Sequence, residues 1–338
     1  MDDMNSFGIL YTLKNGNEPR AGGSLTAELH TNYWKIPLKH GKYERFVDLG
    51  IYINDVARDV STISFYLPFK ITKSDISDLG NKLKDSNLLC TLFNGEYSIQ
   101  NIANSPSYYS VKSRNDDHRT FWLYILGDNN FEIKEVSPIG CLVNVKILSL
   151  PKIDVGIRPA DNEKPKKRNL YFRFRIRNIP NNCFFYEESI SNDFLQSAFS
   201  KTEMIDFRVN EIREIDPKAL EYITKDKNFV MFNKIHFYFV GSSEEEQIVG
   251  ASDYNDCRIL NQEKWNPYID ESVTTRHLMA YHWKWKGENG QTHQKYNVFV
   301  KTIYKSIQGW SVLKYCGVVF FINLLAAAAW CFISFLFF

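Results

Sequence analysis

The sequence predicts a mostly β protein: an antiparallel, sandwich-like cytoplasmic region with a few short helices, followed by one C-terminal transmembrane α-helix. Aromatic residues make up 15% of the 338 residues, and aromatic side chains favour strands. Short runs of aromatic and β-branched residues recur between turn residues, which is typical of antiparallel sheets. The stretch from Cys316 to Phe338 contains no charged residue and is longer than the roughly 20 residues that a membrane-spanning helix needs.

Composition points to a folded intracellular chain. Hydrophobic residues reach 44% and charged residues 24%, near the averages of globular proteins, so general disorder is not expected. The net charge is +2, and attraction to nucleic acid or lipid must therefore come from a local cluster. The 6 cysteines are scattered, which favours reduced thiols over a disulfide framework or a metal site. Asp2 and Asp3 stand where a signal peptide would carry positive charge.

Turn residues divide the first half into predicted strands. Asn15 and Gly16 supply the positive φ that a tight turn needs, which predicts a hairpin over residues 9–29. The turn at residues 127–130 predicts a second hairpin. Ser74 is a candidate N-cap for a helix over residues 75–89, where apolar residues recur at helical spacing. The strands predicted in this half cover residues 46–53, 63–69, 121–126, 131–136 and 141–148.

The second half begins after residues 159–167, whose two prolines and several charges predict a linker or an exposed loop. Strands are predicted over residues 170–179, 205–212 and 235–240, short helices over residues 194–199 and 217–223, and a last strand pair over residues 278–286 and 296–304. We therefore predict two β-rich cytoplasmic lobes and a tail, over residues 1–158, 159–309 and 310–338.

The strongest local signal is a basic cluster. Side chains two apart on a strand share a face, so three arginines would form a basic row while Phe172, Phe174 and Ile176 point into the core. Arginine forks match phosphate oxygens, in a nucleotide, an oligonucleotide or a phospholipid. The alternative is a solvated strand face whose arginines pair with carboxylates of a neighbouring strand, such as Asp206. The predicted ligand-binding residues are Lys164, Lys166, Lys167, Arg168, Arg173, Arg175 and Arg177.

The tail predicts both an orientation and a packing face. Lys301, Lys305 and Lys314 precede it and no charge follows, so the positive-inside rule predicts a single pass through the inner membrane with the preceding residues in the cytoplasm. The amide of Asn323 needs a hydrogen-bond partner in lipid, and the small residues Ala326 to Ala329 let helices approach closely. The alternative is a monomeric anchor in which the amide bonds locally. The predicted pore or helix-packing residues are Asn323, Ala326, Ala327, Ala328 and Ala329.

Motifs for catalysis, a cofactor or a metal are not evident in the sequence. His277, His282 and His293 lie in one stretch without an HExxH spacing, which favours core or interface histidines over zinc ligands. No GxSxG, Walker loop or GxGxxG follows a predicted strand. We therefore expect no enzymatic activity, no cofactor and no metal.

Two classes of function fit these features. In the first, a membrane-bound homo-oligomer senses an anionic ligand with its cytoplasmic region, and its tail helices form a channel or disrupt the membrane. The expected partners are then membrane lipid, further copies of the chain, and a nucleotide or oligonucleotide. In the second, a passive tail-anchored scaffold recruits a partner protein to the membrane.

The layout resembles that of the membrane effectors of bacterial anti-phage systems. The basic stretch Lys164 to Arg177 and the tail Cys316 to Phe338 are arranged similarly to the channel effector of the Hailong system, although no catalytic or binding motif is shared. The resemblance implies a homo-oligomer that depolarises the membrane, controlled by an oligonucleotide that a partner nucleotidyltransferase makes.

Overall fold

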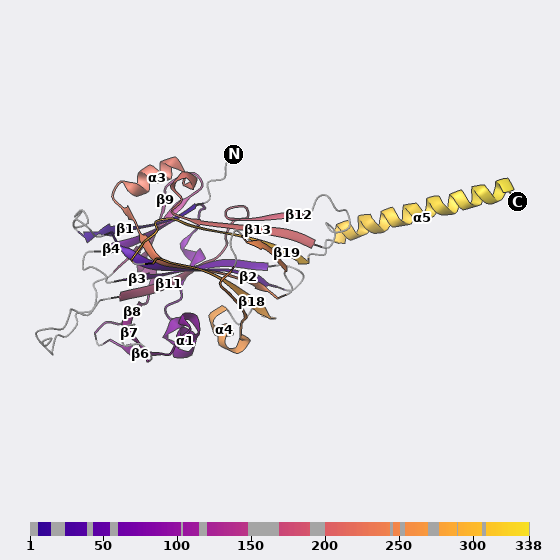
Figure 1. The fold of residues 1–338 in the computed structure, drawn as a ribbon. Helices are drawn as coiled ribbons and strands as arrows, with labels where there is room; N and C mark the ends of the chain where they lie inside the picture. The colour runs from indigo at the N-terminus through magenta and orange to yellow at the C-terminus, as the bar shows by residue number, and fades with distance from the viewer. Residues whose placement is uncertain are drawn as a thin grey trace, which may run out of the picture.

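A computed structural model describes most of the chain. The described residues are 6–14, 24–38, 43–54, 60–102, 104–114, 120–147, 169–189, 200–243, 246–250, 254–269, 277–288, 290–305 and 309–337. Two β-sheets lie face to face, with short helices on their outer faces and one long helix, α5, projecting from one end (Figure 1). The predicted mostly β, sandwich-like fold with one C-terminal apolar helix is confirmed.

The first sheet has nine strands. Seven follow the order β16-β19-β13-β1-β4-β10-β9, while β12 pairs with β13 and β14 pairs with β1. In chain order these strands are β1 (Ser6–Leu13), β4 (Val60–Leu67), β9 (Phe131–Glu135), β10 (Cys141–Lys146), β12 (Phe185–Ser189), β13 (Ser200–Val209), β14 (Asn228–Phe229), β16 (Glu246–Gly250) and β19 (Tyr296–Lys305).

The second sheet has ten strands. Nine follow the order β17-β18-β15-β2-β3-β11-β8-β7-β6, and β5 pairs with β11. In chain order these strands are β2 (Thr26–Pro37), β3 (Tyr43–Ile53), β5 (Ile76–Asp78), β6 (Tyr97–Asn101), β7 (Tyr108–Ser113), β8 (Thr120–Tyr124), β11 (Asn169–Ile176), β15 (Met231–Ser242), β17 (Asp256–Ile259) and β18 (Leu278–Lys286).

Most neighbouring strands are antiparallel. Three pairs are parallel, namely β1 with β13, β8 with β11, and β2 with β15. Because parallel neighbours cannot be joined by a tight hairpin, these pairs connect segments that are far apart in the chain. The β2–β15 pair matters most for the site described below, because it sets His30 beside His236.

The main core fills the space between the two sheets. Alternate residues of each strand point into it, as on β2, where Leu29 and Tyr33 are fully buried. Aromatic rings from both sheets pack there, and the centroids of Phe7 and Phe207 lie 5.0 Å apart. Such ring contacts add to the stabilisation that comes from burying apolar area.

A buried ion pair also joins the two sheets. Lys35 Nζ on β2 lies 2.5 Å from Glu203 Oε2 on β13, and both side chains are fully buried. Tyr33 Oη donates to Glu203 Oε1 over 3.0 Å, and Arg45 Nε donates to the same oxygen over 3.2 Å. A buried charge cluster of this kind favours one alignment of the sheets, because any other alignment would leave a charge without its partner.

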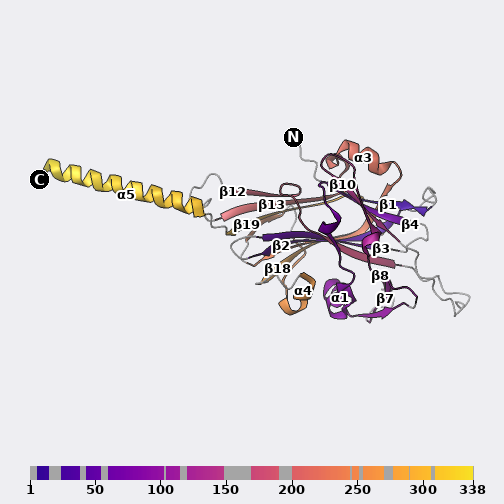
Figure 2. The same ribbon diagram turned by 180° about the vertical axis from the view of Figure 1, so that it is seen from behind.

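Short helices cover the outer faces. Helices α1 (Ser86–Phe93) and α4 (Gln262–Ile269) lie on the ten-stranded sheet, and α3 (Pro217–Thr224) lies on the nine-stranded sheet (Figures 1 and 2). The side chain of Asp85 caps α1, and that of Asp216 caps α3 beside a proline in its first turn, a favourable helix start. The predicted helix over residues 217–223 is thus confirmed, while residues 194–199 lie outside the described residues.

The helix predicted over residues 75–89 is wrong in its first part. The 3-10 turns Lys73–Asp75 and Lys82–Lys84 flank the short strand β5, and α1 begins at Ser86. The pairing of β5 with the buried strand β11 overrides the helical spacing of the apolar residues. The predicted N-cap Ser74 lies inside the first of these turns.

Three predicted strand pairs are also wrong, because the chain crosses between the sheets. Strands β1 and β2, β8 and β9, and β18 and β19 follow one another in sequence, yet the members of each pair belong to different sheets. The strands themselves lie close to where they were predicted. Several of these strands pair with a different neighbour in the chain, β2 with β3, β8 with β7 and β9 with β10, whereas β19 pairs with the more distant β13.

The strands on either side of residues 158/159 are interleaved. In the nine-stranded sheet, β13 lies beside β1, and in the ten-stranded sheet, β11 lies beside β3 and β15 beside β2. The ranges 1–158 and 159–309 therefore contribute to the same two sheets and the same core. The predicted linker, residues 159–167, lies outside the described residues.

Helix α5 (Gly309–Phe337) contains one candidate membrane span, Val312–Phe335, which is not buried against the rest of the protein. It extends away from the sandwich beyond the ends of β13 and β19 (Figure 2). Large side chains along it, such as Phe320, Phe321 and Trp330, are more than 60% exposed. An exposed apolar surface of this length is suited to lipid.

Candidate functional site

A pocket opens on the outer face of the ten-stranded sheet, beside α1. Its volume is about 260 Å³, and strands β17, β18, β15, β2 and β11 supply its lining together with the end of α1. The lining includes four cationic side chains and one carboxylate. These are Arg173, Lys234, Arg258, Lys284 and Asp256.

Strand alternation and register explain why these side chains meet. Lys234, His236 and Tyr238 are two apart on β15, so they share the outer face. The register sets His236 opposite His30 on one side and Lys284 on the other. The adjacent row sets Tyr238 opposite His282. The pocket is therefore built on regular strands, which hold side chains more rigidly than loops do.

Two of the cations are free to meet a ligand. Arg258 is half-buried and Lys284 is exposed, and neither forms an ion pair with another described residue. Lys234 differs, since its Nζ lies 3.4 Å from Glu28 Oε2. The pocket mouth thus carries unbalanced positive charge, which favours an anion.

Arg173 contributes charge to the pocket, and each of its three nitrogens already donates a hydrogen bond within the protein. It is fully buried, and its three nitrogens donate to Tyr268 Oη over 2.6 Å, Tyr171 Oη over 3.2 Å and Asn32 Oδ1 over 2.7 Å. Gly50 on β3 leaves room for this arrangement, because a Cβ there would clash with Tyr171 Oη. Interactions with these tyrosines and Asp48 keep the pKa of Arg173 raised despite burial, so its charge persists.

Three histidines line the pocket. His236 Nδ1 and His282 Nε2 are 2.8 Å apart, and the His282 ring stacks on Tyr238 with centroids 4.1 Å apart. Burial lowers the pKa of His30 and His236, and it lowers the pKa of His282 to about 4. These shifts favour the neutral imidazoles, and the hydrogen bond between His236 and His282 uses the lone pair of one of these two rings.

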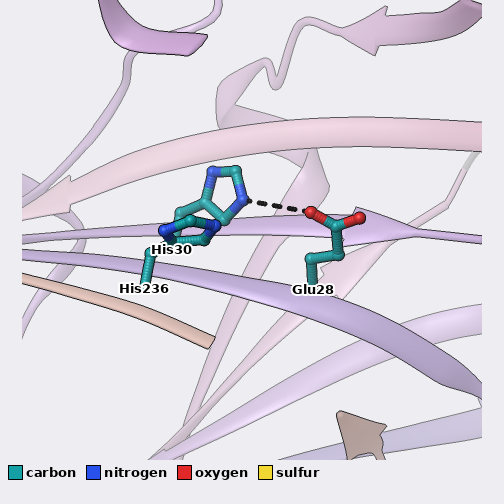
Figure 3. Close-up of side chains that lie close together, drawn as sticks. All are labelled: Glu28, His30 and His236. Carbon is teal, nitrogen blue, oxygen red and sulfur yellow. Dashed lines mark ion pairs between the residues drawn. The ribbon is translucent and has the colours of Figure 1, made fainter. Parts of the chain in front are cut away.

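Three side chains could hold a metal ion. Glu28 and His30 on β2 and His236 on β15 place one ligand atom each within 4.8 Å of one another (Figure 3). No metal is predicted from the sequence, and of the three histidines singled out there, His282 lies beside this group. His277 and His293 do not line the pocket.

The predicted basic row is placed differently from its expected position. Arg173 and Arg175 are buried rather than solvent-facing, because α4 covers this face: Arg175 Nη1 donates to the backbone oxygen of Ile269 over 2.8 Å. Arg175 Nε donates to Asp48 Oδ1 over 2.7 Å. Arg177, at the end of the row, is partly exposed and pairs with Glu44.

These contacts agree in part with the alternative prediction, in which the arginines pair with carboxylates of a neighbouring strand. The neighbouring strand is β3, which supplies Asp48 and Glu44. Asp206 pairs with Arg208 instead. Phe172, Phe174 and Ile176 point into the core as predicted. Of the seven predicted ligand-binding residues, Arg173 lines the pocket. Lys164, Lys166, Lys167 and Arg168 lie outside the described residues.

In the tail, Asn323 Nδ2 donates to Val319 O over 2.9 Å, within its own helix. This is the local bond of the monomeric-anchor alternative. Ala326, Ala327, Ala328 and Ala329 lie on the exposed part of α5.

Sequence reasoning missed His30, His236, Lys234 and Arg258. On β15 the residues Lys234, His236 and Tyr238 alternate with Ile235, Phe237 and Phe239, and this alternation was a signal of a polar outer face. The partner strand β2 is some two hundred residues earlier, so nothing local could show that His30 would join them.

No protein-family model matches the chain, and no curated protein matches its sequence.

Proposed function

We propose that this protein is a membrane-anchored sensor of an anionic ligand, a nucleotide or one end of an oligonucleotide, which binds in the pocket between α1 and β17. The observation that carries the proposal is the presence of Arg258 and Lys284 at the pocket mouth without a carboxylate partner among the described residues. A guanidinium and an ammonium group, one half-buried and one exposed, match the oxygens of a phosphate.

The remaining lining suits a ligand that also carries a planar, partly apolar group. Phe93, Tyr238 and Ala280 line the same pocket as the cations. Its volume, about 260 Å³, is near the lower limit of ligand pockets, about 300 Å³. This size favours a single nucleotide unit over a long stretch of nucleic acid.

The apolar helix α5 supports a membrane location. In the proposed function, Val312–Phe335 crosses the inner membrane once with the sandwich on the cytoplasmic side, and several copies of α5 assemble into a channel or a membrane-disrupting bundle that ligand binding controls. The small residues Ala326 to Ala329 would let the helices of that bundle approach one another closely.

The ligand-binding part is tested on full-length protein in detergent, titrated with labelled ATP and with a short oligodeoxynucleotide. Replacing both Arg258 and Lys284 with alanine should weaken binding by at least about tenfold, since bonds to charged groups contribute about 1.5–3 kcal/mol each. The matched control removes two exposed lysines of helix α3 and its C-cap, Lys218 and Lys225, on the far side of the sandwich, and should leave binding unchanged. Binding that is unaffected by the pocket variant, or by raised salt, would overturn this part.

The membrane part is tested by reconstituting the protein into liposomes and measuring ion flux with and without the nucleotide. The Asn323→Leu variant should change flux or the mass of the detergent-solubilised complex. If both stay unchanged, the amide takes no part in a pore.

A second candidate function is the passive scaffold, and the bond from Asn323 to Val319 favours it. An amide that is satisfied within its own helix needs no second copy in the membrane. This candidate predicts a monomer in detergent, no ion flux and no toxicity on overexpression, whereas the sensor should lose its toxicity when residues 316–338 are deleted.

A further inference from the structure

We propose that Glu28, His30 and His236 bind a divalent transition-metal ion, with zinc the best match, at the edge of the pocket, which His30 and His236 line. The two strands β2 and β15 run parallel here, and their register fixes His30 directly beside His236. Glu28 is two residues before His30 and shares its face of the sheet (Figure 3). One ligand atom from each of the three lies within 4.8 Å of the others.

His30 has a buried nitrogen that needs a partner. Its Nε2 is buried and makes no hydrogen bond in the described part of the chain. The nearest carboxylate oxygen, Glu28 Oε2, is 3.7 Å away, too far for a hydrogen bond. A metal ion at about 2.0–2.2 Å from each of these two atoms would give His30 Nε2 the partner that it lacks.

The second histidine is oriented as metal-binding histidines usually are. His236 Nδ1 is 2.8 Å from His282 Nε2, which leaves Nε2 of His236 available as the ligand atom. Ligating histidines almost always bond through their other ring nitrogen to a supporting group, which fixes the ring.

The donor set identifies the class of metal. Two imidazoles and a carboxylate suit zinc and its neighbours in the first transition row, whereas magnesium and calcium prefer oxygen alone. Three protein ligands leave a coordination position open. If the proposed function also holds, an oxygen of the anion held by Arg258 and Lys284 would occupy that position.

Lys234 is the local competitor of the metal. Its Nζ lies 3.4 Å from Glu28 Oε2, on the same side as the proposed ion. Like charges repel, so replacing Lys234 with methionine should tighten metal binding. A site that merely pairs Glu28 with Lys234 would show no such gain.

The test uses EDTA-treated, full-length protein in detergent, without nucleotide. Titration with Zn²⁺ against a chromophoric chelator should give one ion per chain, and Co²⁺ should produce the visible absorption bands of a low-symmetry site. His30→Gln and His236→Gln should each lose this binding, as should Glu28→Gln. His282→Phe, which keeps the stacking on Tyr238 but not the support of His236, should weaken binding by about 10- to 100-fold.

The matched control is His293→Gln, because the ring of His293 packs against Trp285 outside the pocket and should not affect the metal. Thermal unfolding of each variant checks that the variant is folded. If a histidine variant is not folded, the Glu28→Gln variant tests the metal site in its place. The proposal is overturned if folded wild-type protein takes up no Zn²⁺ and gives no Co²⁺ bands, or if binding survives the loss of both His30 and His236.

Zinc binding by Glu28, His30 and His236 can be measured separately from the nucleotide binding of the proposed function. Replacing Arg258 and Lys284 should reduce nucleotide binding while stoichiometric zinc binding persists. Nucleotide binding measured in EDTA reports on the cations without the metal.

Discussion

At the scale of single residues, the buried carboxylate of Asp48 balances two guanidinium groups. Arg175 Nε donates to its Oδ1 over 2.7 Å, and Arg173 Nη2 lies 3.9 Å from its Oδ2. Tyr268 Oη and Trp34 Nε1 donate to Oδ2 as well. Burial alone would raise the pKa of Asp48, but the charge and hydrogen bonds of Arg175, with Arg173 and Tyr268, hold it below its usual value.

Asp48→Asn should therefore destabilise the protein strongly. It leaves two buried arginines without a counter-charge, and breaking a buried ion pair costs about 3–5 kcal/mol. The free energy of unfolding, measured by chemical denaturation, checks this. In the control Asp206→Asn, the lost pair with Arg208 is part-exposed and should cost less than about 1 kcal/mol. Equal losses in the two variants would contradict the buried-network interpretation.

A second carboxylate predicts a pH dependence. Burial raises the pKa of Asp78 to about 6, although the amides of Gly80 and Asn81 donate to it over 3.0 and 3.2 Å. The folded protein then holds a proton that the unfolded chain releases near pH 4. This contribution to stability is fully present below the unfolded pKa and is lost as the pH rises through 6.

The Asp78→Asn variant cannot titrate and should lose this effect. The free energy of unfolding of the wild-type protein should decline between pH 4.5 and about 7. This contribution to the decline should be absent from the Asp78→Asn variant. The control Asp128→Asn alters an exposed carboxylate of the same charge. A wild-type curve that runs parallel to the Asp78→Asn curve would show that Asp78 does not titrate in this range.

At the scale of elements, the outer faces of the strands could be predicted only in part. The alternation Phe172, Phe174, Ile176 locates the core-facing side of β11 from sequence alone, because strand alternation is a local property. Whether the other side meets water depends on α4, which follows some ninety residues later and covers Arg175. The basic row was therefore predicted with the right spacing and the wrong exposure.

The candidate site shows the same limit. The side chains of the pocket come together only because particular strands are neighbours in the sheet. The parallel pair β2–β15, for example, joins segments that are far apart in the sequence. Strand positions follow from local residue preferences, but strand pairing follows from burial of the whole chain. The apolar tail was the easiest element to predict, because its length and lack of charge are themselves the signal.

Helix α1 forms one wall of the pocket through Leu92 and Phe93, and its start depends on one side chain. Asp85 Oδ1 accepts from the amides of Asn87 and Leu88 over 2.8 and 3.4 Å. Asp85→Ala should cost about 1 kcal/mol of stability by denaturant titration. Asp85→Ser, which can still cap, should cost clearly less, and an equal cost for both would assign the effect to charge rather than capping.

At the scale of the whole molecule, both sheets are assembled from both halves of the chain. Strand β13 lies between β1 and β19, and β11 lies between β3 and β8. A fragment ending near residue 158 would lack β15 beside β2 and β11 beside β3, and would leave the hydrogen-bonding edges of β2 and β3 unpaired there.

We therefore expect residues 1–158 and 159–309 not to fold when produced separately. The full-length protein should unfold in one cooperative transition that is the same by circular dichroism and by tryptophan fluorescence. Two separate transitions, or a soluble half with native-like dispersion in its NMR spectrum, would instead show that the halves are independent domains.

The way α5 leaves the sandwich also determines how the anchor is held mechanically. Strand β19 pairs with β13 along its full length, from Tyr296 with Val209 to Lys305 with Ser200, and α5 begins four residues later at Gly309. A force along β19, from a moving or curving membrane, would load all of these hydrogen bonds together in shear. In the proposed function, the membrane would pull on the nine-stranded sheet through β19, while the pocket lies on the ten-stranded sheet, away from the strands that bear this load.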